Sequence, residues 1–132
     1  MKIQDLCNLI DQILDEYATV KRFKIGKTDN LENREEDYHE KGYNFIHPLY
    51  TGEKEEISQA EKDLIKYFTE TSRHKNKCTN KQEGGGSPDA TMLYLAIEKE
   101  DASINDLNIK ELILDKYFSN QQQNKHYEDK NS

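Results

Sequence analysis

The sequence has no tryptophan, two prolines and two cysteines among its 132 residues, and only 33% of those residues are hydrophobic. With a mean hydropathy of −1.09, such a chain can bury one modest core but not two. It has no long apolar run and no secretory segment, so we expect a soluble, cytoplasmic protein that does not enter a membrane. Cys7 and Cys78 show no CxxC or paired-histidine spacing, which argues against a zinc site and a disulfide.

Basic charge is scarce overall but concentrated locally. The formal net charge is −7, which excludes a generic nucleic-acid coat protein, since that class carries a net basic surface. Two segments nevertheless contain several cations and no acid. They are residues 21–28, with Lys21, Arg22, Lys24 and Lys27, and residues 71–82, with Arg73, Lys75, Lys77 and Lys81. An anion-binding site within an acidic protein is compatible with this pattern.

Residues 23–34 (FKIGKTDNLENR) are the stretch around which we expect the chain to be organised. They predict a short strand over 23–25 that breaks at Gly26, where the missing Cβ permits a turn. Thr28, Asp29 and Asn30 can cap a helix over 31–41, with Glu32 in capping-box position relative to Asp29. A glycine turn at a basic helix entrance is a plausible phosphate site.

Hydrophobic periodicity predicts the remaining elements. Residues 3–17 form an amphipathic helix, and Gly42 ends the helix over 31–41. Pro48 marks the next strand as an edge or irregular strand. The later elements are a strand over 44–50, a helix over 55–69, a long connection over 70–91, a strand over 92–99 and a helix over 104–118.

This order of elements predicts a small α/β or α+β domain over residues 1–118, in which helices flank about three strands. The connection over 70–91 contains Gly84-Gly85-Gly86-Ser87-Pro88, and a loop of this length is either functional or simply disordered. The polar tail over 119–132 has almost nothing to bury, so we expect it to be disordered.

Glu61 is the least expected residue in the sequence. The helix over 55–69 places it between Ile57 and Ile65, in the middle of the apolar stripe. A buried carboxylate is costly unless it is paired or binds a cation. The alternatives are that Glu61 lies at the edge of the stripe and reaches solvent, or that it pairs with a structural arginine or lysine.

Arg34 shares a helical face with Leu31 and Tyr38, so it should point toward the body of the protein. An inward arginine near a glutamate could hold a phosphodiester while the carboxylate holds a divalent ion. A structural Arg34–Glu61 ion pair without chemistry is the alternative. His39, about one turn beyond Arg34, could carry a proton.

Gly26-Lys27-Thr28 also matches the end of a phosphate-binding P-loop, but the full pattern requires a glycine where Lys21 stands. The intervening span is predicted to be a strand, so nucleotide hydrolysis by a P-loop is excluded.

The segment FKIGKT-x-N-L-x-x-R, followed by a strand and by a helix carrying ISQAEKDLIKYF, resembles the GIY-YIG nuclease superfamily in its divergent members with a K-I-G-x-T core. The resemblance covers about residues 23–68. Ile25 and Gly26 match the last two letters of YIG, Arg34 matches the arginine of the first helix, and Glu61 matches the metal-binding glutamate. Asn80 aligns loosely with an asparagine of some members.

The resemblance departs from the family at the tyrosines. Lys24 replaces the first YIG residue, and a helix stands where the GIY strand would precede it. In a rearranged sheet the strand with Tyr94 could occupy that place and supply the phenol; Tyr43 is a second possibility.

The resemblance implies a nuclease that hydrolyses DNA phosphodiesters with one Mg²⁺ or Mn²⁺ held by Glu61. In this reading Arg34 would hold the phosphate and Tyr94 would take part in proton transfer. The residues themselves add three further expectations. Lys24 would stabilise developing charge, His39 could carry a proton, and the backbone contacts would come from Lys21, Gly26, Lys27, Arg73, Lys75 and Asn80. The alternatives are a nucleic-acid-binding domain without cleavage, DNA being a more natural ligand than RNA, and an inactive acidic module that binds a protein partner.

Overall fold

A computed structural model describes residues 2–17, 19–80 and 88–99. Three helices and a three-stranded antiparallel sheet make up this part of the chain, in the order α1 (Ile3–Glu16), β1 (Val20–Thr28), α2 (Leu31–Glu40), β2 (Phe45–Thr51), α3 (Lys54–Glu70), a 3₁₀ turn η1 (Lys75–Lys77) and β3 (Met92–Lys99). The fold is therefore α+β, as the sequence predicts. The expected helix over 104–118 and tail over 119–132 lie outside the described residues.

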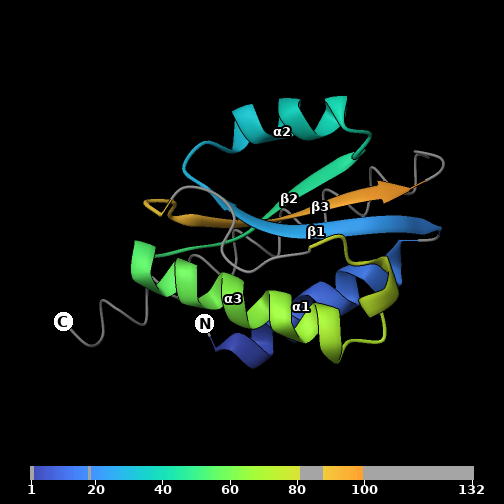
Figure 1. Cartoon of the computed structure of the whole chain (residues 1–132), viewed down its shortest axis with the longest axis horizontal. Helices are drawn as coiled ribbons and strands as arrows, with labels where there is room; N and C mark the ends of the chain where they lie inside the picture. Colours follow the sequence, from blue (N-terminus) through green and yellow to red (C-terminus); the bar gives the residue numbers. More distant parts are fainter. Residues whose placement is uncertain (1, 18, 81–87, 100–132) are drawn as a thin grey trace.

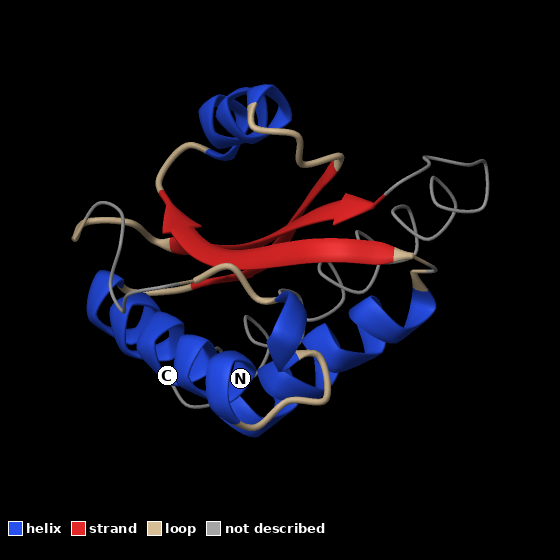
Figure 2. Cartoon of the chain, turned by 45° about the vertical axis from the view of Figure 1, so that its right-hand side comes forward, coloured by secondary structure: helices blue, strands red, loops and turns tan. Residues whose placement is uncertain are grey.

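The sheet has the strand order β1-β3-β2, so the last strand of the sheet in the chain lies in its centre. Figure 1 shows α2 on one face of the sheet and both α1 and α3 on the other, and Figure 2 shows the same three layers after a turn of 45° about the vertical axis. Each strand pairs with a neighbour far away in sequence, which periodicity alone does not reveal.

The two faces of the sheet bury different material. Side chains alternate between faces along a strand, so Phe23 and Ile25 of β1 point toward α1 and α3, where they join the main hydrophobic core. The opposite face packs a smaller, tyrosine-rich cluster under α2. That cluster consists of Tyr38, Tyr43, Ile46, Tyr94 and Ala96.

The predicted break at Gly26 is wrong. β1 continues through Gly26 to Thr28, because Gly26 lies opposite Tyr94 in β3, and a Cβ at residue 26 would overlap the Tyr94 hydroxyl. The glycine thus makes room for a neighbouring phenol and does not turn the chain. The turn comes three residues later, and Asn30 caps α2 by accepting a hydrogen bond from the Asn33 backbone N–H at 3.2 Å, in place of the expected Asp29–Glu32 capping box.

Other local predictions are confirmed. The strand over 92–99 has the predicted bounds, Gly42 follows α2 in the left-handed region with φ of 97°, and β2 with Pro48 is an edge strand whose register is irregular between Pro48 and Tyr50.

No helix in the described ranges is long and apolar enough to cross a membrane.

The first part of the expected long loop is well structured. Residues 78–80 run along the outer edge of β1, where Thr79 donates its backbone N–H to the Phe23 carbonyl at 2.8 Å. The Asn80 carboxamide accepts from the Ile25 N–H at 2.9 Å and donates to the Ile25 carbonyl at 2.8 Å. This side chain therefore bonds β1 as the backbone of a neighbouring strand would.

Candidate functional site

Glu61 is buried in α3, as its place in the apolar stripe predicts. Its exposed fraction is 1%, and it lies on the helix face that also buries Ile57 and Leu64. Its Oε1 atom has no hydrogen-bond partner among the described residues. Burial raises the pKa of this carboxyl to about 7, although the positive charges of Lys27 and Lys24 oppose the shift. A buried carboxylate oxygen without a partner is costly, so this position is poorly explained by packing alone.

Lys27 brings a positive charge to the same region from β1. It is 6% exposed, and its ammonium donates a hydrogen bond to the Ser58 hydroxyl at 2.9 Å. Ser58 precedes Glu61 by one helical turn, on the same side of α3. Lys27 therefore lies close enough to act on the carboxylate, yet its ammonium bonds the serine hydroxyl.

Tyr94 of β3 is affected by charges on both α2 and α3. Its hydroxyl donates to the Tyr38 hydroxyl of α2 at 2.9 Å. Burial, and then this donated hydrogen bond, raise the pKa of Tyr94 far above its usual range; the positive charge of Arg34 lowers that pKa and the negative charge of Glu61 raises it. Tyr94 is thus a neutral phenol at physiological pH that senses the charges of α2 and α3 together.

Arg34 remains available on α2. Its side chain is 37% exposed and forms a loose ion pair with Asp37, at 3.9 Å and one turn along the helix. Such an exposed pair contributes little to stability. Among the described residues Arg34 forms no ion pair with Glu61, so the structural Arg34–Glu61 pair considered from the sequence is absent there.

Lys27 and Glu61 lie on the α3 side of the sheet, whereas Lys24, Arg34 and Tyr94 lie on its α2 side. The charges of these residues act on one another across the sheet. Other predicted residues lie outside this group. Lys21 and Lys75 are exposed. His39 is exposed and lies 3.9 Å from Glu35 on its own helix, and Asn80 bonds the backbone of β1 as described above.

Arg73 does not join this group. It forms a close ion pair with Asp15 of α1 and lies 3.8 Å from Asp11, and it follows the C-terminal end of α3 at Glu70, which lies roughly 13.5 Å along the helix axis from Glu61. The two basic segments therefore do not converge on one site through this residue.

Two features were missed by sequence reasoning. Tyr38 is the first: its hydroxyl accepts the hydrogen bond from Tyr94. Its position about one helical turn after Arg34 could have indicated that it belongs to the same site. Asp11 is the other: it is 4% exposed in α1 and accepts hydrogen bonds from Tyr67 at 2.7 Å and Ser72 at 2.8 Å. Helical spacing places Asp11 between Cys7 and Leu14 on the apolar face, so the argument applied to Glu61 would have found it.

The carboxylates near this site do not form a ready metal cage. Across residues 2–17, 19–80 and 88–99, no group of three or more His, Cys, Asp or Glu side chains could hold a metal ion. Among the buried carboxylates of the described residues, Glu61 has an oxygen without a hydrogen-bond partner. A single carboxylate fits Mg²⁺, which usually keeps several waters and completes its coordination with substrate phosphate oxygens.

No protein-family model, curated protein or solved structure matches this chain. The resemblance to the GIY-YIG superfamily therefore stays a prediction based on the residues quoted for it.

Proposed function

We propose that this protein is a divalent-metal-dependent phosphodiesterase that cleaves DNA, with Glu61 as its metal ligand. The observation that carries the proposal is the Glu61 Oε1 atom, which is buried and lacks a hydrogen-bond partner among the described residues. The positive charges of Lys27, Lys24 and Lys62 act on this carboxyl. The carboxyl and Arg34 also act on Tyr94, whose pKa Glu61 raises and Arg34 lowers. Cations around one carboxylate favour a phosphate group over an uncharged ligand.

The roles of the side chains follow from their charges and hydrogen bonds. A Mg²⁺ or Mn²⁺ ion held by Glu61 would polarise the phosphoryl group of the substrate. Arg34 would bind phosphate oxygens with its half-exposed guanidinium, while Lys24 and Lys27 would offset the negative charge that builds up during hydrolysis. Because Tyr94 donates to the Tyr38 hydroxyl, the Tyr38 proton is left to bond another acceptor, such as a substrate oxygen.

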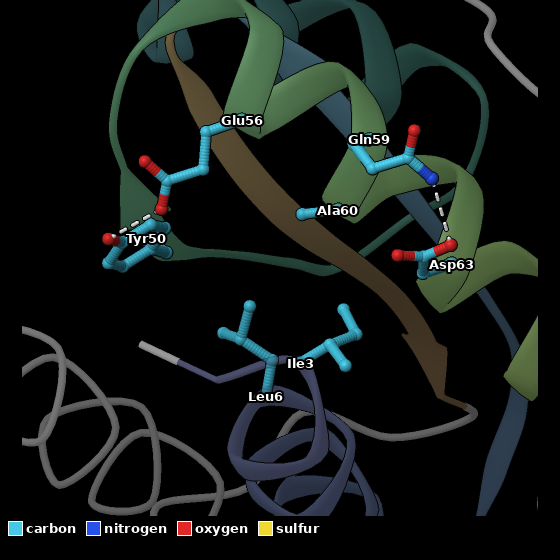
Figure 3. Close-up of a pocket in the computed structure, with 7 residues that line it drawn as sticks. All are labelled: Ile3, Leu6, Tyr50, Glu56, Gln59, Ala60 and Asp63. Atoms are coloured by element: carbon cyan, nitrogen blue, oxygen red, sulfur yellow. Dashed lines mark hydrogen bonds between the residues drawn. The ribbon is translucent and has the colours of Figure 1, made fainter.

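A second function, an acidic module that binds a protein partner, is favoured by a separate observation. An apolar cavity of about 250 Å³ lies between the N-terminal part of α1 and α3. Figure 3 shows Ile3 and Leu6 facing Ala60 across it, between a Tyr50–Glu56 and a Gln59–Asp63 hydrogen bond. Ile3 is 38% exposed. This cavity is separate from the group around Glu61, so the two functions can be tested independently.

The test is cleavage of supercoiled plasmid and single-stranded DNA with Mg²⁺, Mn²⁺ or EDTA. Glu61→Gln keeps the size of the side chain but removes its charge, and Glu55→Gln makes the same change at an exposed position of α3. We expect metal-dependent nicking by the wild type and by Glu55→Gln, and a loss of about 10²-fold or more in Glu61→Gln.

Circular dichroism would establish that each variant is folded. Absence of cleavage by the folded wild type on either substrate, or full activity of Glu61→Gln, would contradict the proposal. If the folded wild type cleaves neither substrate, the binding of a protein partner at the cavity lined by Ile3 becomes the favoured function.

A further inference from the structure

A cleft on the α2 side of the sheet is distinct from the group around Glu61 but shares Lys24 with it. The cleft has a volume of about 440 Å³. It is lined by Arg22, Lys24, Tyr38, Lys41, Tyr43 and Thr79. These residues come from β1, from α2 and the turn after it, and from the segment that runs along the edge of β1.

One wall of this cleft is held rigidly by Arg22. Its guanidinium forms a close ion pair with Glu98 of β3, donates to the Lys41 carbonyl at 2.7 Å and lies over the Tyr43 ring at 4.3 Å. Arg22 Nη2 lies against the turn, 3.4 Å from the place a Cβ at Gly42 would take, which is ordinary van der Waals contact. A planar cation fixed by three contacts needs little reorganisation to bind a ligand.

The other two cations have no acidic partner. Among the described residues neither Lys24 nor Lys41 forms an ion pair with a carboxylate; their ammonium groups instead lie 5.7 and 5.3 Å from the centre of the same ring, that of Tyr38. Two like charges gathered at one ring repel each other. An anion in the cleft would relieve this repulsion, and Glu98 neutralises only Arg22.

The hydroxyl groups at the other side of the cleft are bonded within the protein. Thr79 donates its hydroxyl to the Phe23 carbonyl at 3.1 Å, so in the 2.9 Å bond between the Tyr43 and Thr79 hydroxyls Tyr43 is the donor. The donors left for phosphate oxygens in the open cleft are the ammonium groups of Lys24 and Lys41.

We propose that this cleft binds a backbone phosphate of a single polynucleotide strand, one that continues from the phosphate bound near Glu61. The proposal deepens the proposed function and rests on it for the direction of the strand. The geometric link is β1, whose Lys24 lines the cleft and whose Lys27 bonds Ser58, one turn before Glu61 on α3. Specific recognition of bases is not required, because backbone contacts alone provide affinity.

The experiment measures binding of a fluorescein-labelled twelve-nucleotide oligothymidylate in EDTA, where cleavage is prevented. Lys41→Gln removes one cation of the cleft, and Lys66→Gln removes one from an exposed position on α3. We expect Lys41→Gln to weaken binding about threefold to tenfold at low salt, and to reduce the slope of log K against log salt by about 0.7. Lys66→Gln should bind like the wild type.

Equal binding by Lys41→Gln and the wild type would overturn the proposal. Binding of inorganic phosphate without binding of the oligonucleotide would also overturn it, since the ligand would then be a free ion. The two hypotheses fail separately. If the wild type cleaves no DNA but its binding depends on Lys41, the proposed phosphodiesterase activity is wrong and the cleft proposal stands. If the wild type cleaves DNA but its binding does not depend on Lys41, the cleft proposal is wrong and the activity stands.

Discussion

Asp11 and Glu61 are two buried carboxylates on neighbouring helices, but their hydrogen bonding differs. Asp11 of α1 accepts hydrogen bonds from Tyr67 and Ser72 and lies 3.8 Å from Arg73. Glu61 of α3 is buried even more completely, yet its Oε1 has no hydrogen-bond partner among the described residues. Both interrupt an apolar helix face, so sequence pattern alone does not distinguish them.

The difference separates a structural carboxylate from one that fits a ligand. Asp11 joins α1 to the end of α3 and to the turn that follows it, which is a sufficient reason for a buried charge. Glu61 forms no hydrogen bond through Oε1 with any described residue. Burying this oxygen costs folding free energy, and a ligand bound there would offset that cost. Substituting each acid by its amide should therefore change stability in opposite directions.

The largest effect is expected for Asp11→Asn. The variant loses a charged acceptor of two hydroxyl hydrogen bonds, so we expect a loss of about 2–3 kcal/mol in the free energy of unfolding. Urea unfolding at pH 7 would measure it. A loss below about 0.5 kcal/mol would show that the network around Asp11 is not structural.

Glu61→Gln is expected to stabilise the protein at pH 8 by about 2 kcal/mol. The pKa shift alone corresponds to about 3 kcal/mol, and the buried glutamine amide, which also lacks a partner, offsets part of it. The pKa of Glu61 rises from 4.5 to about 7 on folding, so between these values the folded state binds the proton more tightly than the unfolded state does. Stability is therefore lost as pH rises through this window, and it stays lost above it. Unfolding curves at pH 4 and pH 8 should show the gain only at pH 8; an equal gain at both would contradict the raised pKa.

A smaller effect is expected from metal ions. If Glu61 binds Mg²⁺ or Mn²⁺, an ion concentration ten times its dissociation constant should stabilise the wild type by about 1.4 kcal/mol at pH 8. The effect should fade below pH 7, because the ion requires the deprotonated carboxylate. Thermal unfolding with and without the ions would measure it, and Asp11→Asn should respond like the wild type while Glu61→Gln should not. The same shift in Glu61→Gln would place the ion elsewhere.

Local chemistry explains why most of the elements were predictable. The alternation of apolar side chains over residues 92–99 predicts β3. The apolar stripe of α3 makes Glu61 recognisable as a carboxylate at a buried position. The order of the strands was not predictable, since β3 pairs with two strands that lie far from it in sequence. The meaning of Gly26 depended on this pairing: only the position of Tyr94 shows that the missing Cβ makes room for a ring.

The same limit applies to the site. Charge counting suggested that Arg73 would face a ligand, but it meets Asp15 and Asp11 of α1. Asn80 was expected near phosphate, but its amide bonds Ile25. In both cases the partner is more than 50 residues away, so spacing along the chain could not identify it.

The Asn80 side chain also bears on how this protein behaves in concentrated solution. An unpaired sheet margin is a template on which a foreign strand can add, which leads to aggregation or strand exchange between molecules. At Ile25 that template is already filled by a carboxamide, and on the opposite margin Pro48 has no N–H to offer. An incoming chain would have to displace Asn80 before it could extend the sheet at Ile25.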